Sequence, residues 1–189
     1  MSLVRSLLVA ALALAVPFTA RAAGGHDSVG CGGCHSIHTA KGKIIFAVTP
    51  NTKALDPKTK QPYSGTTALC LACHADSKDG GQGYAPVSGH MSHPYGVSSV
   101  NPKVAKVPGE LLRDGRFECI GCHDPHPSNP NYKYLRVDTA KGQQMDAFCG
   151  VCHPGKADAA TVKQAALFTS MDESGAKRAA APAPAPAKK

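Results

Sequence analysis

Hydrophobic residues occur along this chain in short groups, separated by polar, Gly-rich and Pro-rich stretches. Clusters of β-branched and aromatic residues at 44–48 and 132–137 predict short strand-like pieces. Apolar positions at helical spacing over 157–171 predict a helix that stops at Gly175, so that 158–175 forms a C-terminal helical segment. The pattern therefore predicts a fold that is mostly coil with short α-helices and little β structure.

The two ends of the chain differ in composition from the rest. Residues 1–22 combine an early arginine, an apolar run and an Ala-Arg-Ala cleavage site, which predicts a signal peptide. Pro17 breaks the run, and the run is shorter than the roughly 20 residues that span a bilayer, which disfavours the alternative of an uncleaved anchor. Residues 176–189 are rich in Ala and Pro and are expected to form a disordered tail. The folded domain is therefore expected at 23–157.

Composition limits what the chain can pack by itself. The sequence has no Trp, 19 Gly and 15 Pro among 189 residues. Side chains alone would form a poor hydrophobic core at this length. We therefore expect a bound group to supply much of the buried apolar surface.

All eight cysteines lie in four Cys-x-x-Cys-His motifs. Two thiols three positions apart can form thioether bonds with the vinyl groups of one haem, and the next residue can give its imidazole to the iron. The motifs therefore predict four covalently bound haem c groups. The attachment residues are Cys31, Cys34, Cys70, Cys73, Cys119, Cys122, Cys149 and Cys152, and the proximal ligands are His35, His74, His123 and His153.

Other uses of paired cysteines fit the motifs less well. Zinc sites need four ligands but give no reason for a histidine after every second cysteine. A thioredoxin-like dithiol needs one motif near a βαβ pattern, which is not visible here. A disulfide framework would also leave the four histidines unexplained.

The motifs form two similar pairs, which defines a repeat of two haem sites. The first and third motifs are each followed by another histidine three residues after the proximal one, and the second and fourth are not. One pair occupies 26–78 and the other 115–157. A Gly-rich and Pro-rich connection covers 79–114 and has too little periodicity for a long helix.

Five histidines outside the motifs are candidates for the distal axial positions: His26, His38, His90, His93 and His126. The chain between His35 and His38 is too short to pass around a porphyrin, so His38 must serve another haem, and the same holds for His126 after His123. The simplest assignment gives His38 to the second haem, at Cys70 and Cys73, and His126 to the fourth, at Cys149 and Cys152. The third haem, at Cys119 and Cys122, then takes His93 or His90. The first haem, at Cys31 and Cys34, takes His26 or whichever of His93 and His90 the third haem does not use.

Methionine is the alternative axial ligand. Met91 and Met145 could each supply a thioether, which would raise the reduction potential relative to two imidazoles. Isolated methionines more often fill gaps in packing. We therefore expect bis-His coordination and low-potential iron at all four sites.

The chain resembles the doubled Cys-x-x-Cys-His multihaem cytochromes. The resemblance rests on the paired motifs, on the run from Cys122 to His126, and on the Ser-His-Pro stretch at 92–97, and it covers 26–155. It implies that His93 acts as an axial ligand in preference to His90. The architecture is also similar to extracellular cytochrome filaments, although an Ala/Pro-rich tail is not part of the family pattern.

These features predict an exported electron-transfer protein, periplasmic or extracellular and suited to anaerobic respiration, and not an enzyme. The expected donors are other c-type cytochromes or a membrane quinol dehydrogenase, and the expected acceptors are a terminal reductase or an outer-membrane conduit. The alternatives are a homo-oligomer or filament, and a multihaem reductase in which one iron has an open coordination position. After signal cleavage no membrane span is expected.

Charge does not change this interpretation. The formal net charge is +8, but the ionised propionates of four haems would bring the loaded protein close to neutral. The sequence therefore gives no support for nucleic-acid binding. Lysines in the first half either offset propionates or form a solvated basic surface: Lys41, Lys43, Lys53, Lys58 and Lys60.

Overall fold

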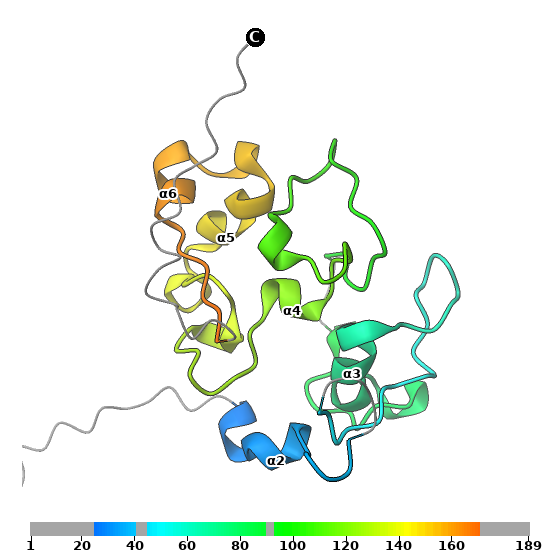
Figure 1. Ribbon diagram of the computed structural model, residues 1–189. Coiled ribbons are helices and arrows are strands. Elements are labelled where there is room, and N and C mark those ends of the chain that lie inside the picture. Colours follow the sequence, from blue (N-terminus) through cyan, green and yellow to red (C-terminus); the bar gives the residue numbers. More distant parts are fainter. Residues whose placement is uncertain (1–24, 41–44, 90–92, 171–189) are drawn as a thin grey trace, which may run out of the picture.

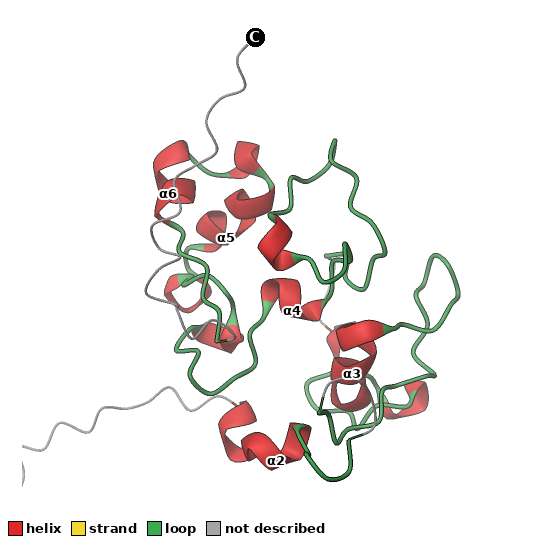
Figure 2. Cartoon of the chain, viewed as in Figure 1, coloured by secondary structure: helices red, strands yellow, loops and turns green. Residues whose placement is uncertain are grey.

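Short helices joined by long loops make up the part of the chain described by the computed structural model, residues 25–40, 45–89 and 93–170 (Figure 1). No strand occurs within these ranges (Figure 2). The α-helices are α2 (Gly30–Cys34), α3 (Gly65–His74), α4 (Cys119–Cys122), α5 (Met145–Cys152) and α6 (Ala159–Gln164). The 3-10 turns are η1 (Gly25–Ser28), η2 (Ser77–Asp79), η3 (Val87–Gly89), η4 (Gly109–Leu111), η5 (Tyr132–Tyr134), η6 (Ala140–Gly142) and η7 (Pro154–Lys156).

The predicted class, mostly coil with short helices, is confirmed. The expected signal peptide at 1–22 and tail at 176–189 lie outside the described residues, as do His90 and Met91. No helix in the described ranges is long and apolar enough to cross a membrane. In Figure 1, α3 lies on one side of the molecule, α5 and α6 on the other, and α4 between them.

Isolated β-bridges take the place of the two predicted strand-like pieces. Antiparallel bridges join His35 to Phe46 and His123 to Leu135. Helices α2 and α4 end immediately before these histidines, so very little extended backbone is available on that side for pairing. Residues 45–48 and 132–137 therefore form no strand, and Tyr132–Tyr134 form the turn η5 instead.

The first and third motifs have the same local hydrogen bonds, as their sequence similarity predicts. After α2, the Ser36 N–H donates to the Ile45 carbonyl and the Ala47 N–H to the Cys34 carbonyl. The equivalent bonds after α4 run from the Asp124 N–H to the Tyr134 carbonyl and from the Arg136 N–H to the Cys122 carbonyl. Each bridge therefore holds a motif histidine against a segment about ten residues further along the chain.

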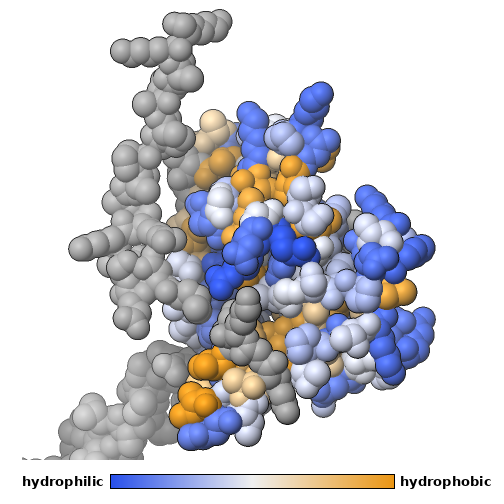
Figure 3. Space-filling model, turned by 45° about the vertical axis from the view of Figure 1, so that its right-hand side comes forward, coloured by the Kyte–Doolittle hydropathy of each residue, from blue (hydrophilic) through white to orange (hydrophobic). Residues whose placement is uncertain are grey.

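The hydrophobic core is small. One cluster consists of Ala54, Leu71 and Ala75, with Tyr63 and Tyr95 packed against it. Apolar residues also reach the surface between polar ones (Figure 3). Side-chain burial of this extent gives little hydrophobic stabilisation for a domain of this size, as the composition predicts.

The C-terminal helix is shorter than the predicted segment 158–175. Asp158 caps its N-terminus by accepting from the backbone N–H groups of Ala160 and Thr161. The helix ends because Ala165 is extended. Beyond it the chain bonds to Arg136, whose carbonyl accepts from the Phe168 N–H and whose Nη1 donates to the Phe168 carbonyl at 2.9 Å.

Candidate haem-binding site

A single helical turn presents the cysteines of each motif. The backbone N–H of the motif histidine donates to the carbonyl of the first cysteine at 2.8 Å for His35, 3.0 Å for His123 and 2.9 Å for His153. A turn of this kind puts residues three apart on the same face. All eight cysteines have free thiols, so each motif holds two thiols for thioether bonds.

Backbone carbonyls orient three of the four motif histidines. Their Nδ1 atoms lie within hydrogen-bonding distance of a carbonyl oxygen, which leaves Nε2 available to a metal. Burial lowers the pKa of His123, against the opposing effect of its bond to the Lys133 carbonyl, and so favours the neutral ring that binds iron. The bonds join His74 to Tyr84 at 2.7 Å, His123 to Lys133 at 2.9 Å and His153 to Val104 at 3.0 Å.

The Nδ1 atom of His35 is buried and has no partner among the described residues. The bridge of His35 with Phe46 is equivalent to that of His123 with Leu135. The residue equivalent to Lys133 is therefore Ile44, which lies outside the described residues.

Three of the motif histidines face an imidazole from elsewhere in the chain. With metal–nitrogen bonds of about 2 Å and a ring radius of about 1 Å, two imidazoles on opposite sides of one metal have centroids about 6 Å apart. The observed centroid separations are 5.8 Å for His26 and His74, 6.3 Å for His35 and His126, and 6.2 Å for His93 and His153. Each separation is long enough to admit one metal ion between the two rings.

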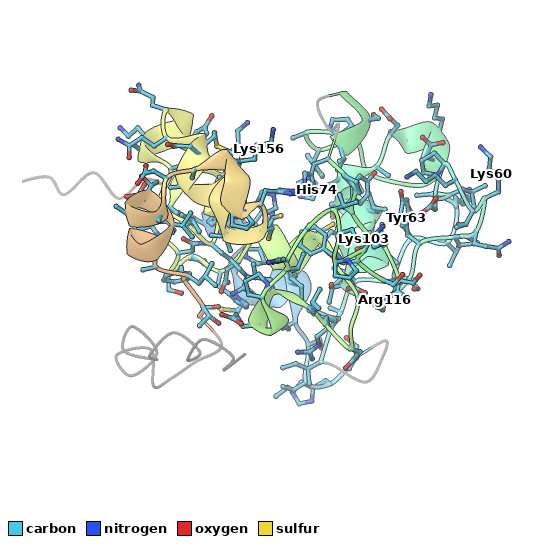
Figure 4. The ribbon with its side chains drawn as sticks, turned by 90° about the horizontal axis from the view of Figure 1, so that it is seen from above. Lys60, Tyr63, His74, Lys103, Arg116 and Lys156 are labelled. Atoms are coloured by element: carbon cyan, nitrogen blue, oxygen red, sulfur yellow. The ribbon has the colours of Figure 1, made fainter. Side chains whose placement is uncertain are left out.

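The pair of His26 and His74 also shows which atoms face each other. Their Nε2 atoms are 3.5 Å apart, close to the separation of about 4 Å that two metal–nitrogen bonds would give. His74 lies in the middle of the molecule, between the parts that contain α3 and α5 (Figure 4). Both Nε2 atoms are therefore directed as axial ligands of one iron would be.

Contacts from the second half of the chain hold His26 in place. Its Nδ1 is 3.2 Å from the Pro125 carbonyl, and its backbone N–H donates to the Tyr134 hydroxyl at 3.1 Å. That hydroxyl donates in turn to Asp27 at 2.9 Å. The segment before the first motif is thus fixed by residues that follow the third motif.

A pair of backbone bonds anchors the chain just after His93. The Val97 N–H donates to the Phe117 carbonyl at 3.1 Å, and the Phe117 N–H returns a bond of 3.0 Å. The His93 ring also makes an edge contact with Phe117, at 6.1 Å between centroids. The Ser-His-Pro stretch is therefore tied to the residues just before the third motif while its histidine faces His153 of the fourth.

The observed pairs differ from the simplest assignment drawn from the sequence. His126 faces His35 and not the fourth motif, His26 faces His74 and not the first motif, and His93 faces His153 and not the third motif. Each of these three histidines therefore lies beside a motif that the assignment did not give it, because tertiary contacts and not chain proximity position it. His38, expected to serve the second site, is exposed.

Met145, the alternative ligand within the described residues, begins α5 and is 41% exposed.

His123 has no facing imidazole among the described residues. The sequence had also left His90 open for that site, but His90 lies outside the described residues.

Neighbouring thiols show that the motifs follow one another in space in the order of the sequence. Burial and the nearby Cys73 thiol raise the pKa of Cys34. A hydrogen bond with Cys119, together with burial, raises the pKa of Cys70. Burial and the nearby Cys152 thiol raise the pKa of Cys122 to about 12. The first site therefore adjoins the second, the second the third, and the third the fourth.

Two buried carboxylates flank the third motif, and the sequence alone had not singled them out. Glu118 is 2% exposed and accepts from the Thr66 N–H at 2.7 Å, which connects α3 to the residue before Cys119. Asp124 is 1% exposed. Burial alone would raise the pKa of Asp124, but hydrogen bonds from Ser170 and His126 outweigh this effect and lower it. Their only sequence signal is an acidic residue on each side of Cys-x-x-Cys-His.

Residues 112–158 match the family model described as Doubled CXXCH motif. The match is to the doubled Cys-x-x-Cys-His motif that is typical of multihaem c-type cytochromes. It covers α4 and α5, the helices that carry the third and fourth motifs of the chain. Searches of the curated proteins and of the solved structures found no match.

Proposed function

We propose that this cytochrome carries four covalent haem c groups and passes electrons along them without making or breaking substrate bonds. The observation that carries the proposal is the set of facing imidazoles, each joining a motif histidine to a histidine from elsewhere in the chain. Bound haem supplies the one-electron couple of its iron. The chain contributes the attachment sites, the axial imidazoles and their orientation.

The axial ligands follow from these pairs. Two imidazoles on one iron favour a lower potential than an imidazole and a methionine. The assigned sets are His35 with His126 at Cys31 and Cys34, His74 with His26 at Cys70 and Cys73, and His153 with His93 at Cys149 and Cys152.

For the sixth ligand of the third haem, two candidate histidines are left. His38 and His90 are the histidines that the three pairs leave over. Alanine at one of these positions is expected to convert one haem from low-spin to high-spin, and alanine at the other to leave the spin state unchanged. If neither variant changes a haem, the third iron has an open face and the reductase alternative gains support.

Electron counting and ligand binding test the function together. The cytochrome, purified from a host with haem-maturation machinery, is reduced with dithionite and mixed with an excess of a small oxidised c-type cytochrome. Transfer of four electrons per chain is expected. Carbon monoxide binding to the native reduced protein would contradict closed six-coordinate sites and favour a reductase.

A filament subunit is the second candidate. Ile37 is 77% exposed and Val29 is 50% exposed, both beside the first motif. Apolar surface of this kind at one site could be covered by a second copy. Size exclusion and electron microscopy of the haem-loaded protein distinguish the two, because a discrete species of monomer mass removes the filament.

Export is part of the proposal, and it is supported by the composition of residues 1–22. The expected partners are other c-type cytochromes or a quinol dehydrogenase as donor and a terminal reductase or outer-membrane conduit as acceptor. Cell fractionation with N-terminal sequencing tests this, with a mature protein that begins at Ala23 outside the cytoplasm as the expected result. A product that begins at Met1 and fractionates with membranes would favour the retained anchor.

A further inference from the structure

His126 differs from the other assigned axial histidines in the group that holds its Nδ1 atom. We propose that Asp124 tunes the haem attached at Cys31 and Cys34: its buried carboxylate accepts the Nδ1–H of His126 and lowers the reduction potential of that haem. The inference rests on the proposed function, because it takes His126 as an axial ligand.

The geometry of this contact is well defined. Asp124 Oδ1 lies 2.7 Å from His126 Nδ1. The carboxylate is 1% exposed and is fixed by the Ser170 N–H, which donates to Oδ2 at 2.7 Å. Arg136 Nη1 lies 3.9 Å from Oδ2, so it moderates the negative charge from the side away from the histidine. The carboxylate is therefore held rigidly where it meets the ring.

Peptide carbonyls take this place at four of the other assigned ligands, whereas the Nδ1 of His35 has no partner among the described residues. The Nδ1 of His26 lies 3.2 Å from the Pro125 carbonyl, and that of His93 lies 3.0 Å from the Pro94 carbonyl. The proximal rings of the second and fourth sites likewise face carbonyl oxygens. Within the described residues, the carboxylate contact is thus particular to His126.

A carboxylate is a stronger acceptor than a peptide carbonyl, because it carries a full negative charge. It draws the Nδ1 proton away from the ring, which makes Nε2 a stronger electron donor to the metal. Stronger donation stabilises ferric iron relative to ferrous iron. The reduction potential of that haem is therefore expected to be lower than it would be if a peptide carbonyl accepted the Nδ1–H of His126.

Ser170 moderates this contact. Its hydroxyl lies 2.6 Å from His126 Nδ1 and 2.8 Å from Asp124 Oδ1, so it competes for the Nδ1–H and also donates to the carboxylate. Both effects weaken the bond between Asp124 and His126. Removing the hydroxyl should therefore shift the potential opposite to the shift caused by removing the charge.

Spectroelectrochemistry of the full haem-loaded chain tests the proposal. We expect Asp124→Asn to move one haem transition to a more positive potential and Ser170→Ala to move the same transition to a more negative one. The control is Glu118→Gln, which alters a carboxylate of similar burial that bonds to Thr66 and Arg116 and not to a histidine. It should leave that transition in place.

His126→Ala identifies the haem concerned. It also tests the axial role of His126 separately from the effect of Asp124 on the potential. If this variant leaves every haem low-spin by electron paramagnetic resonance, His126 is not a ligand and the axial assignment fails. If it makes one haem high-spin while Asp124→Asn and Ser170→Ala leave all potentials unchanged, only the role of Asp124 is overturned. Shifts of equal sign in the two variants would also overturn it.

Discussion

The carboxylate of Glu118 accepts a hydrogen bond from the backbone N–H of Thr66, 2.7 Å away, at the start of α3. The same carboxylate accepts from Arg116 Nε at 2.9 Å. Helix α3 ends in the second haem motif, and Glu118 directly precedes the third. This contact therefore links the two halves of the molecule at the place where Cys70 meets Cys119.

Replacing Glu118 with alanine should destabilise the haem-loaded protein. The change leaves the Thr66 N–H and the Arg116 guanidinium without their buried acceptor, and the loss of such an acceptor costs about 1–3 kcal/mol. Thermal unfolding followed by the haem absorption should show a lower midpoint. Glu110→Ala is the control, because Glu110 is exposed, and an equal loss in both variants would contradict the account.

Position 65 should not tolerate a side chain. Gly65 has φ +62 at the start of α3, and an added Cβ would clash with Glu118 Oε1. The left-handed backbone alone costs about 1–2 kcal/mol for other residues. We expect Gly65→Ala to lower the unfolding midpoint clearly, whereas Gly155→Ala, where a Cβ meets nothing within 4 Å, should lower it little.

The three imidazole pairs make a separate prediction for each distal histidine. Alanine at His26, His93 or His126 should each convert a different single haem from low-spin to high-spin, since each ring faces a different motif histidine. Electron paramagnetic resonance of the oxidised variants counts the haems affected. Two variants that change the same haem would refute the pairing.

Haem removal should abolish the native fold. Few hydrophobic residues are buried among the described ones, and Ala54, Leu71 and Ala75 form one small cluster. Groups that bind only the folded state contribute directly to its stability. A variant with alanine at all eight cysteines should show little helical signal by far-UV circular dichroism and no cooperative unfolding. A cooperative transition in that variant would show that the chain folds without haem.

The sequence predicts the parts of the site that depend on local chemistry. The spacing of Cys31, Cys34 and His35 requires only one helical turn, and the structure has that turn. The similarity between the first and third motifs likewise predicts their common bridges. The strand-like pieces predicted at 44–48 and 132–137 were wrong, because their described residues form only isolated bridges and the turn η5.

The motif histidine beside each of His26, His93 and His126 could not be predicted in this way. His26 reaches His74 because Pro125 and Tyr134 hold it, and these contacts join residues about 100 positions apart. Proximity in sequence gives no information on such contacts. Asp124 and Glu118 were missed for the same reason, since burial and hydrogen-bond partners, not residue type, set them apart.

The intact mass of the purified protein, taken with its reduced absorption spectrum, tests the central claim most directly. The account predicts the mass of the processed chain plus four haems, and a c-type spectrum that remains after acid extraction of free haem. A colourless, folded polypeptide with no added haem mass, or one that carries zinc or disulfides at its cysteines, would contradict it.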